Sequence, residues 1–381
     1  MEFQNRMEKM EPRIEIIENT SDTTTFTLSG TNVSLANALR RTLLSDIPMV
    51  IFRTAPNEQN KCVIFENTSR LNNEIIKQRL GCIPIHITNE ADFPINNYLM
   101  EVQVENNTDN ILYVTTEDFV VKDLVSNKDL SKDTVREIFP PNDITGYYID
   151  FVRLRPRISA EIPGEKLHLT CKFDIGTAKE DGMFNAVSTC SYGFTVDTAV
   201  QEAELAKKMQ TWRDEGKNAE QIKFDAENWR LLEGKRIFRK DSFDFIVQSV
   251  GVYTNEQLLN TACKILIQRL EDVDALIEKD ELEIKNSENT MTNSFDIVLE
   301  NEDYTIGKVI EYFMHTKFYQ TNMLTFCGFK KMHPHDTYSV IRVAYSNPVE
   351  KSTIKGNLKT CIQDAVEVYT KIKKDFLKLI K

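Results

Sequence analysis

Two long amphipathic helix patterns, one in each half of the chain, constrain the fold most. The second begins at about Ser352, and its apolar residues recur at alternating spacings of four and three: Leu358, Ile362, Ala365, Tyr369, Ile372 and Phe376. A stripe of this period is typical of a helix that packs on a partner helix. The first pattern has similar spacings over 259–277: Leu259, Ala262, Leu266, Leu270, Val273 and Ile277. Each helix needs an apolar surface to cover its stripe, and each half of the chain could supply one to the other.

The elements before these two helices follow the same order in both halves. A strand precedes a short capped helix, further strands follow, and the long helix comes last. The short helix of the first half repeats leucine every four residues from Leu35 to Leu43, and that of the second half begins at about Thr305. A charged break at 278–281 separates the halves. This weak internal repeat predicts an α+β fold with a pseudo-dimer inside one chain.

Shorter patterns add detail to the first half. A helix is expected from Asn72 to Leu80, capped by Asn72 or Asn73, with Gly81 at the position after the helix where a left-handed backbone is common. The clearest strand runs from Lys166 to Ile175, where apolar and polar residues alternate.

A charged stretch at 198–233 predicts a solvated helical insertion, which Trp212 and Trp229 could anchor to a neighbour. The basic run Lys235-Arg236-Ile237-Phe238-Arg239-Lys240 follows it. This run could contact phosphate, although an ordinary charged turn is the favoured interpretation.

Composition narrows the class of protein. The 381 residues include 47 Lys and Arg against 58 Asp and Glu, which gives a net charge of −11. This acidic balance argues against a free-standing nucleic-acid binder. No apolar run reaches the ~18 residues that a membrane span needs. Residues 1–9 have no apolar core of a signal peptide, so we expect a cytosolic or nuclear protein.

The sequence carries no motif that predicts catalysis or metal binding. It has neither a phosphate-binding loop nor a nucleophile elbow, and its 13 glycines offer little material for phosphate-cradling loops. Its seven cysteines are scattered, without the close pairs that a structural zinc site uses. His333 and His335 flank Pro334, which favours a polar turn over a metal site. We therefore predict no catalytic, cofactor-binding or metal-binding residues.

Several blocks of the first half are similar to one known family. They are Ser34–Pro48 (SLANALRRTLLSDIP), Asn73–Pro84 (NEIIKQRLGCIP), Leu167–Cys171 (LHLTC), Gly176–Glu180 (GTAKE) and Val247–Gly251 (VQSVG). They resemble the N-A-L-R-R helix and the later motifs of the α-subunit superfamily of multisubunit RNA polymerases. Its members are the bacterial α subunit, the archaeal D subunit and the third-largest subunit of eukaryotic polymerase II.

Two blocks of the second half resemble the small partner of that subunit, which is archaeal L or the eleventh subunit of polymerase II. They are Glu302–Lys308 (EDYTIGK) and Gly328–Pro334 (GFKKMHP), with Tyr304 where the family has histidine. The resemblance implies a natural fusion of both platform subunits. Such fusions are associated with the polymerases of large cytoplasmic DNA viruses.

The resemblance also implies a domain plan. A first, discontinuous dimerisation domain would comprise residues 1–49 and 191–277, around an inserted domain at 50–190. A second dimerisation domain would comprise residues 278–381, and the two would form an intramolecular pseudo-heterodimer. Residues 88–160 contain no cysteine, so the zinc or iron–sulfur cluster that some family members carry in the insertion is not expected here.

Two sets of interface residues follow from the resemblance. The residues expected to pair the two halves are Leu35, Leu39, Leu43, Leu266, Leu270, Ile306, Gly307, Ile310, Phe313, Ile362 and Tyr369. The residues expected to contact the large polymerase subunits are Arg40, Arg41, Arg79 and Lys179, which could instead be solvated charges.

The implied function is a non-catalytic assembly platform, present in one copy, that recruits the largest, second-largest and small polymerase subunits. It would reach DNA only through the complex, would have no membrane partner, and would act in the host cytoplasm and the virion if viral, or otherwise in the nucleus or cytosol. The alternative is a scaffold that reuses the fold in a non-polymerase complex.

Overall fold

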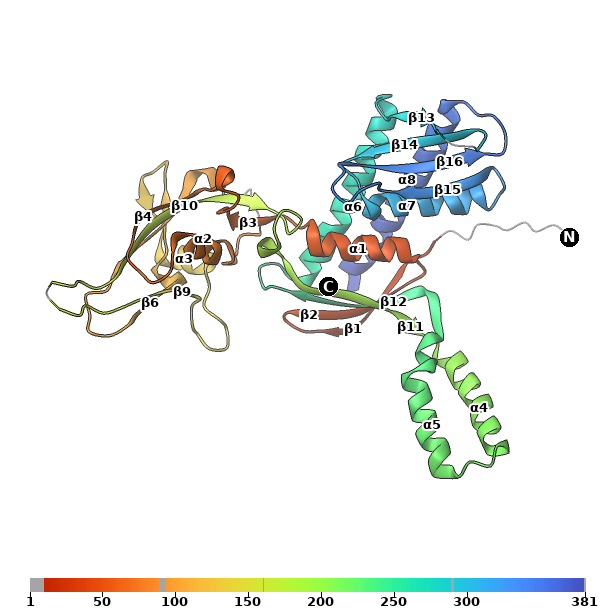
Figure 1. The fold of residues 1–381 in the computed structure, drawn as a ribbon, viewed down its shortest axis with the longest axis horizontal. Coiled ribbons are helices and arrows are strands. Elements are labelled where there is room, and N and C mark those ends of the chain that lie inside the picture. Colours follow the sequence, from red (N-terminus) through yellow and green to blue (C-terminus); the bar gives the residue numbers. More distant parts are fainter. Residues whose placement is uncertain (1–9, 89–92, 160, 289–290, 380–381) are drawn as a thin grey trace. The chain divides into compact units, whose positions relative to one another are not determined.

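The computed structural model describes residues 10–88, 93–159, 161–288 and 291–379; residues 1–9, on which the signal-peptide expectation rests, lie outside this range. The fold mixes helices and sheets, as the sequence predicts (Figure 1). The chain divides into two compact units. Unit 1 comprises Met1–Leu43, Thr189–Gln248 and Asn255–Lys381, and unit 2 comprises Leu44–Ser188 and Ser249–Thr254.

The first half of unit 1 is built on a four-stranded sheet with the order β1-β2-β12-β11. The strands are β1 (Arg13–Asn19), β2 (Thr23–Ser29), β11 (Val187–Val196) and β12 (Phe238–Ser249), and the helices are α1 (Val33–Ser45) and α6 (Asn255–Glu278). The side chain of Asn32 accepts a hydrogen bond from the backbone N–H of Ser34 at 2.8 Å and thereby caps α1.

The second half of unit 1 has a four-stranded sheet with the order β13-β14-β16-β15. Its elements are β13 (Ile284–Asn286), β14 (Ser294–Glu300), α7 (Tyr304–Met314), a π-helical turn η6 (His315–Tyr319), β15 (Leu324–Lys330), β16 (Tyr338–Tyr345) and α8 (Lys351–Leu379). In both sheets the first strand in sequence pairs with the second, the second with the fourth and the fourth with the third. The internal repeat that the sequence indicates is therefore present in the strand order.

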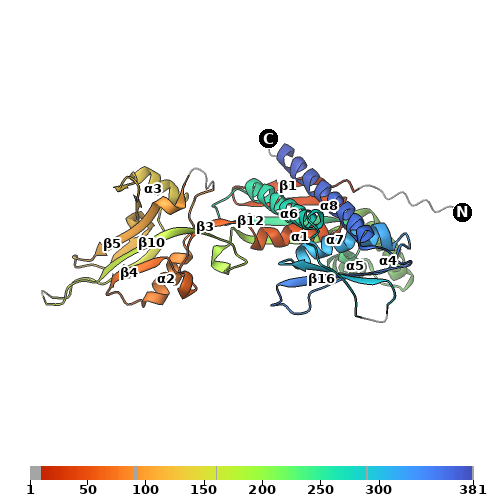
Figure 2. The same cartoon turned by 90° about the horizontal axis from the view of Figure 1, so that it is seen from above.

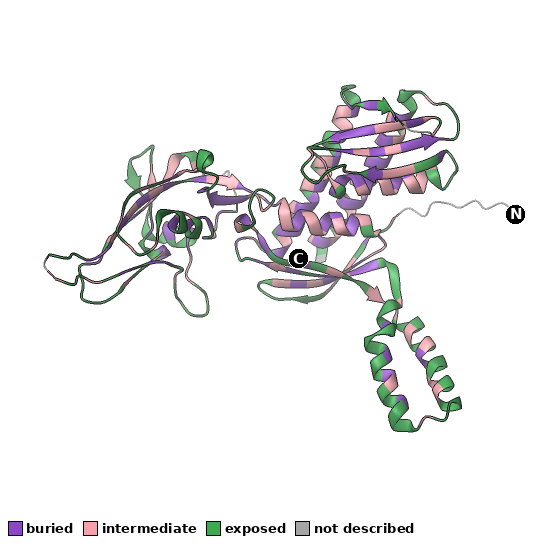
Figure 3. Ribbon diagram, viewed as in Figure 1, coloured by how far each residue is buried: buried purple, intermediate pink, exposed green. Residues whose placement is uncertain are grey.

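The long helices α6 and α8 lie side by side, with their apolar stripes buried (Figures 2 and 3). The end of α8 also reaches the sheet of the first half, where the rings of Phe26 on β2 and Phe376 on α8 meet edge to face at 5.6 Å. Phe26 in turn stacks on Phe245 of β12 at 5.1 Å. The partner helix that the heptad stripe of α8 predicts is thus α6, in the same chain.

Unit 2 contains a sheet with the order β3-β10-β5-β7-β8, in which β4 also pairs with β10, and a separate β6–β9 pair. The strands are β3 (Met49–Phe52), β4 (Cys62–Asn67), β5 (Tyr98–Glu105), β6 (Leu112–Thr115), β7 (Val120–Asp123), β8 (Lys128–Asp129), β9 (Asp150–Leu154) and β10 (Lys166–Gly176), and the helices are α2 (Asn73–Gly81) and α3 (Lys132–Ile138). The long strand β10 coincides with the predicted strand. Single turns of 3-10 helix occur at η1 (Asn57–Gln59), η2 (Ile95–Asn97), η3 (Thr116–Asp118), η4 (Gly182–Phe184) and η5 (Glu233–Arg236).

The end of α2 differs from the prediction at Gly81. Asn72 caps the helix as expected, and its side chain accepts from the N–H of Ile75. Gly81, however, is the last helical residue, and Cys82 caps the helix in the right-handed region. A Cβ atom at position 81 would lie 2.7 Å from the Met183 sulfur and 3.0 Å from the Thr54 hydroxyl. Glycine stands here because neighbouring side chains approach the helix closely, so its predicted left-handed role was wrong.

The charged stretch after β11 forms a helical hairpin, α4 (Thr198–Asp214) and α5 (Ala219–Leu231). Both helices are largely exposed (Figure 3). Trp229 is buried with Leu205 and Ala226, and Trp212 packs against the same small cluster. The neighbour to which the tryptophans anchor each helix is therefore the other helix of the hairpin.

The predicted domain plan stays a prediction beside the division into compact units. The inserted domain was expected at residues 50–190, and unit 2 begins at Leu44, ends its long segment at Ser188 and adds Ser249–Thr254. Most of the first expected dimerisation domain and all of the second fall in unit 1, whereas residues 44–49 and 249–254 of the first belong to unit 2. The separation of the two domains at residue 278 stays a prediction. Within the described ranges, no helix is both long enough and apolar enough to cross a membrane.

Candidate subunit interface

Helix α1 contacts the second half of unit 1 through its buried face. Leu35, Leu39 and Leu43 on this face are buried. The hydroxyl of Tyr369 on α8 donates a hydrogen bond to the Leu35 carbonyl at 3.2 Å, and Tyr369 itself is fully buried. A buried phenol needs such a partner, because an unpaired hydroxyl in the core would be destabilising. This contact joins residues 334 positions apart.

All the residues expected to pair the halves are buried in unit 1. They are Leu35, Leu39 and Leu43 on α1, Leu266 and Leu270 on α6, Ile306, Gly307, Ile310 and Phe313 on α7, and Ile362 and Tyr369 on α8. Their burial is what an interface between the halves requires. Burial alone also fits a general core position, so their role as interface residues stays a prediction.

An ion-pair cluster connects α1 and α6 to the turn before α7. Arg41 on α1 donates to Asp303 at 2.9 Å and to the Thr305 hydroxyl at 2.9 Å. Arg269 on α6 pairs with Glu302 at 2.5 Å and lies 3.8 Å from Asp303. Both carboxylates are on the second half and both arginines on the first, so the cluster fastens one half to the other.

Asp303 also caps the start of α7, so a backbone donor there further favours the charged form of its carboxylate. Its carboxylate accepts from the N–H of Thr305 at 2.8 Å. Burial alone would raise its pKa, but the hydrogen bonds from Thr305 and the charges of Arg41 and Arg269 outweigh that effect and lower it. Asp303 is therefore held ionised at neutral pH.

The shared strand order places α1 and α7 in equivalent positions of the two halves. The contacts that each helix makes with the cap of the other differ. Asn32 caps α1 and Asp303 caps α7. Nine residues after these caps stand Arg41 and Tyr312 respectively. Arg41 binds the α7 cap directly, whereas Tyr312 lines an open hollow of about 650 Å³ together with Gly30, Thr31 and Asn32 of the α1 cap. One of the two equivalent contacts is an ion pair, and the other is not.

Gly307 allows α7 to lie directly on β15. A Cβ atom at this position would fall 1.9 Å from the Cε2 atom of the Phe329 ring. Tyr304 meets the same ring edge to face at 5.0 Å. The contact lies inside the second half, so glycine at position 307 serves first the packing of α7 on its own sheet.

The four residues expected to contact large subunits differ in the contacts that they make within the chain. Arg41 bonds within the chain as described, and Arg40 donates to Asn37 one turn earlier on α1 at 3.0 Å. Arg79 donates to the Phe151 and Asp150 carbonyls at 2.7 and 2.8 Å and thereby ties α2 to β9. Lys179 has an exposed side chain, while its N–H donates to the Ser45 carbonyl. Their contact with other subunits stays a prediction.

Sequence reasoning missed a buried arginine in unit 2. Arg53 donates to Asp174 at 2.5 Å, to Glu180 at 2.7 Å and to the Ile175 carbonyl at 2.6 Å. Burial opposes its charge, but the hydrogen bonds with Asp174 and Glu180 outweigh that effect and raise the Arg53 pKa. Lys61 also pairs with Asp174 at 3.0 Å. The one available signal was Glu180, which belongs to the recognised G-T-A-K-E block.

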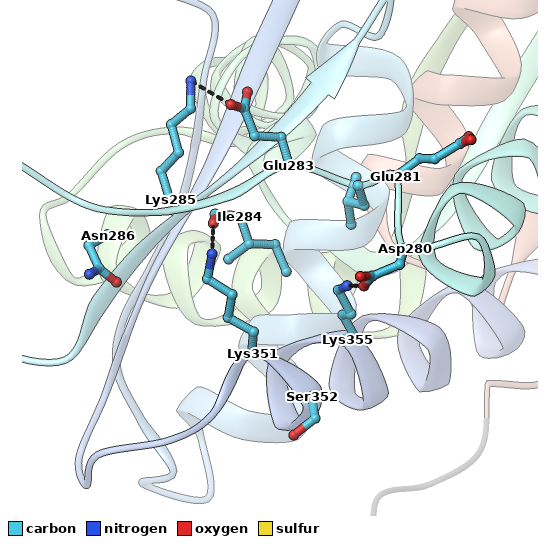
Figure 4. Close-up of a pocket in the computed structure, with 10 residues that line it drawn as sticks. Asp280, Glu281, Glu283, Ile284, Lys285, Asn286, Lys351, Ser352 and Lys355 are labelled. Atoms are coloured by element: carbon cyan, nitrogen blue, oxygen red, sulfur yellow. Dashed lines mark hydrogen bonds and ion pairs between the residues drawn. The ribbon is translucent and has the colours of Figure 1, made fainter.

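A groove of about 930 Å³ lies between the α6–β13 connection and the start of α8 (Figure 4). Its charged side chains pair mainly with each other. Lys285 bonds to Glu283 at 2.9 Å, Lys355 pairs with Asp280, and Lys351 donates to the Ile284 carbonyl at 2.6 Å. These contacts join the segment after α6 to α8, so the groove is accounted for as part of the helix packing.

The residues considered for metal binding form a turn. The N–H of His333 donates to the Asp336 carboxylate at 2.9 Å, and the N–H of His335 donates to the His333 ring at 3.2 Å. Among the described residues, no group of three or more His, Cys, Asp or Glu side chains is arranged to hold a metal ion. The polar-turn interpretation agrees with this geometry.

The two sheets of unit 1 share one strand order, and the long helices that accompany them, α6 and α8, pack on each other. The sequence model for the RNA polymerase Rpb3/Rpb11 dimerisation domain matches residues 25–270, so the chain belongs to that family. The match covers the first half and the inserted segment and ends within α6.

Several curated relatives carry polymerase names. The bovine (Bos taurus) subunit RPAC1 of DNA-directed RNA polymerases I and III is 25% identical over 323 residues, which cover 72% of this chain and 87% of the relative. Subunit Rpo3 of the Pyrococcus horikoshii RNA polymerase is 24% identical, over 68% of this chain and 94% of the relative. Subunit 3B of the Arabidopsis thaliana RNA polymerases IV and V is 26% identical, over 71% and 93%. The resemblance to an RNA polymerase subunit of the Rpb3/Rpb11 type is thereby confirmed.

Proposed function

We propose that this chain is the assembly platform of a DNA-dependent RNA polymerase, with two paired platform subunits fused in one polypeptide. The observation that carries the proposal is the shared strand order of the two sheets, β1-β2-β12-β11 and β13-β14-β16-β15, each completed by a long helix. The family profile covers the first of these folds. The second supplies the partner that a dimerisation domain requires.

Contacts between the two folds support internal pairing. The α6–α8 seam, the Tyr369–Leu35 hydrogen bond and the Arg41–Asp303 ion pair all join the first fold to the second. Burial of apolar stripes contributes about 25 cal/mol per Å². Fusion also gives each fold a high effective concentration of the other, so pairing does not depend on matched expression of two chains.

In this proposal the platform recruits the second-largest and largest polymerase subunits and the small subunits, as one copy per complex. Arg40 and Lys179 are the best placed of the expected contact residues, because Arg41 and Arg79 already serve contacts inside the chain. The catalytic magnesium would belong to the large subunits. This chain would contribute no catalytic residue.

We further propose a viral source, because fused platform subunits are associated with large cytoplasmic DNA viruses. The chain would then act in the cytoplasmic viral factory and be packaged in the virion. Detection of the chain in purified particles and at cytoplasmic replication sites supports this origin, and purely nuclear staining in uninfected cells contradicts it.

The test is purification of the tagged full-length chain from its native source, followed by mass spectrometry and quantification of copies. We expect two very large subunits and several small ones, with one copy of this chain. A homodimer without large subunits, or a stable complex with unrelated proteins, would overturn the proposal and favour a scaffold outside the polymerase.

Two charge-reversal variants sharpen this experiment. Arg40→Glu combined with Lys179→Glu should keep the thermal unfolding temperature and lose the large subunits. The control is Lys207→Glu on the α4–α5 hairpin, where the exposed lysine pairs with Glu204 one turn away. Equal recovery of large subunits with both variants would remove Arg40 and Lys179 from the proposed contact.

A further inference from the structure

The base of the α4–α5 hairpin carries four exposed cations and two exposed aromatic rings. We call Lys235, Arg236, Arg239, Lys240, Phe194 and Phe238 the basic–aromatic patch. Two of the cations lie on η5 and two at the start of β12. One ring comes from the end of β11 and the other from the start of β12. The backbone N–H of Asp197 donates to the Ile237 carbonyl at 3.1 Å, which holds the two sides of the patch together.

The patch is positively charged in an acidic chain. Elsewhere on the hairpin, four of the six cations have carboxylate partners: Lys207 with Glu204, Lys208 with Glu233, Lys217 with Asp225 and Arg230 with Glu202. Lys235, Arg236, Arg239 and Lys240 are all exposed, and none forms an ion pair with another described residue. The net charge of the whole chain is −11, so this local excess is not a general property of its surface.

The carboxylates near the patch either bond to other groups or lie at the edge of the patch. Asp197 accepts from the N–H of Val200 and caps α4. Glu11, which shares a hollow with Lys240, lies 3.7 Å from Arg13. Asp241 follows the basic run and lines the same hollow. No carboxylate of the described residues therefore forms an ion pair with any of the four cations.

The two rings form a fixed platform. Phe194 and Phe238 stack at 4.4 Å with an interplanar angle of 26°, and each keeps more than a third of its surface exposed. Phe194 also leans on the fully buried ring of Phe243 at 5.2 Å. Because Phe243 fixes Phe194, the stacked pair can present a flat apolar surface without ordering loose side chains first.

A ligand that suits this patch carries regularly spaced negative charges and flat apolar groups. Single-stranded nucleic acid has both, since its phosphates meet cations and its unpaired bases stack on aromatic rings. A duplex keeps its bases stacked inside, and an acidic peptide offers charge without flat rings. We propose that the basic–aromatic patch binds single-stranded nucleic acid without sequence preference.

This inference goes beyond the proposed platform function, in which nucleic acid is reached only through the complex. It gives the hairpin, which the platform function does not use, a role in holding an RNA or DNA strand. It can be tested on the isolated full-length chain, so its failure would leave the recruitment of large subunits untouched.

The test is fluorescence anisotropy with the full-length chain and labelled 12-nucleotide RNA, 12-nucleotide DNA, a DNA duplex and polyglutamate of equal length. We expect both single strands to bind more tightly than the duplex and polyglutamate. The logarithm of the binding constant should fall with the logarithm of salt concentration at a slope of about −3, because single strands contribute about −0.7 for each neutralised phosphate. Stronger binding to RNA or to DNA would identify the strand that is held.

Two variants separate stacking from charge. Phe194→Leu with Phe238→Leu keeps the site apolar and should weaken single-strand binding about tenfold or more at an unchanged salt slope. Arg236→Glu with Arg239→Glu should weaken binding and reduce the slope by about 1.4. Lys207→Glu with Lys223→Glu, on the hairpin outside the patch, is the charge-matched control and should bind normally.

Three results would overturn the proposal. Polyglutamate binding as tight as RNA binding would identify the patch as a dock for an acidic polypeptide. Equal losses in the patch and control charge variants would mean that binding is only diffuse attraction. Unchanged affinity in the leucine variant, with its thermal unfolding temperature preserved, would remove the rings from the site.

Discussion

The Arg41 guanidinium lies 2.9 Å from the Asp303 carboxylate, across 262 residues of sequence. The arginine stands on the short helix of the first half, and the aspartate caps the short helix of the second. This pair therefore makes the start of α7 dependent on α1. An arginine that family resemblance assigns to a neighbouring subunit is thus bonded within its own chain.

Asp303→Asn should destabilise the chain although it preserves a capping side chain. Asparagine caps helices about as well as aspartate. The substitution removes the charged acceptor of Arg41 and the charge near Arg269, and hydrogen bonds to charged groups contribute about 1.5–3 kcal/mol. We expect the free energy of unfolding, measured with urea, to fall by about that amount.

The matched control for this substitution is Arg13→Gln, which removes the exposed Arg13–Glu11 pair. Exposed pairs contribute about 0–1 kcal/mol, so this variant should unfold almost as the parent does. Equal effects of the two substitutions would show that the cluster around Asp303 adds nothing beyond an ordinary surface pair.

Acid should weaken the parent more than the Asp303→Asn variant. The folded chain lowers the pKa of Asp303 below the value of about 3.9 found in unfolded chains. The stabilisation is therefore complete above pH ~4 and is lost as the pH falls through the lower folded value. Urea unfolding at pH 7, 4 and 3 should show the difference between parent and variant shrinking toward acid. Asp174 and Asp296 also have lowered pKa values, but they are present in both proteins.

Gly307→Ala should destabilise the second half of unit 1. The new Cβ would overlap the Phe329 ring, and overpacking of this kind costs about 1–3 kcal/mol. The family resemblance places Gly307 among the residues expected to pair the two halves. Because Phe329 belongs to the same half, the first effect should be on α7 and β15, seen as faster hydrogen exchange in those elements.

Gly356→Ala is the matched control, because Gly356 is also a helical glycine. A Cβ at position 356 meets nothing within 4 Å. Alanine favours a helix interior over glycine by about 1 kcal/mol, so this variant should be more stable than the parent. A loss of stability in Gly356→Ala would contradict the packing of α8.

Arg53→Met should destabilise unit 2. It would leave Asp174 with Lys61 as its main cation and would remove the Arg53 donor from the Ile175 carbonyl. Removing one partner of a buried ion pair costs about 3–5 kcal/mol, and the half-exposed Glu180 places this case at the lower end. Hydrogen exchange resolved by peptide should show the loss in β3 and β10 and leave α6 and α8 protected as in the parent.

Periodicity predicted the elements of this fold better than their contacts. The helices α1, α2, α6, α7 and α8 and the strand β10 follow from local spacing and capping residues, and all are present. The partner of α8 could be expected within the chain because a second long stripe was available. Such patterns repeat over a few residues, which is why a single sequence can reveal them.

Side-chain contacts between distant segments could not be predicted from the sequence. Arg41 stands beside Arg40 on α1, and spacing does not tell which of the two faces Asp303. Arg53 finds Asp174 and Glu180 more than 100 residues away, and nothing in its local sequence marks it as buried. Gly81 was misplaced because a helix end and a close approach of Met183 both call for glycine, and only the packed neighbours distinguish them.

The edge-to-face contact of Phe26 with Phe376 limits when, during synthesis, the first half of this protein can complete its folding. Through this contact, part of the core over strand β2 is closed by α8. A ribosome must therefore translate α8, and Phe376 must leave the exit tunnel, before that core can close. At about 5–20 residues per second, the hundred residues after α6 alone take roughly 5–20 s. During that time the nascent first half presents an open apolar face to the chaperones of the cell that makes it.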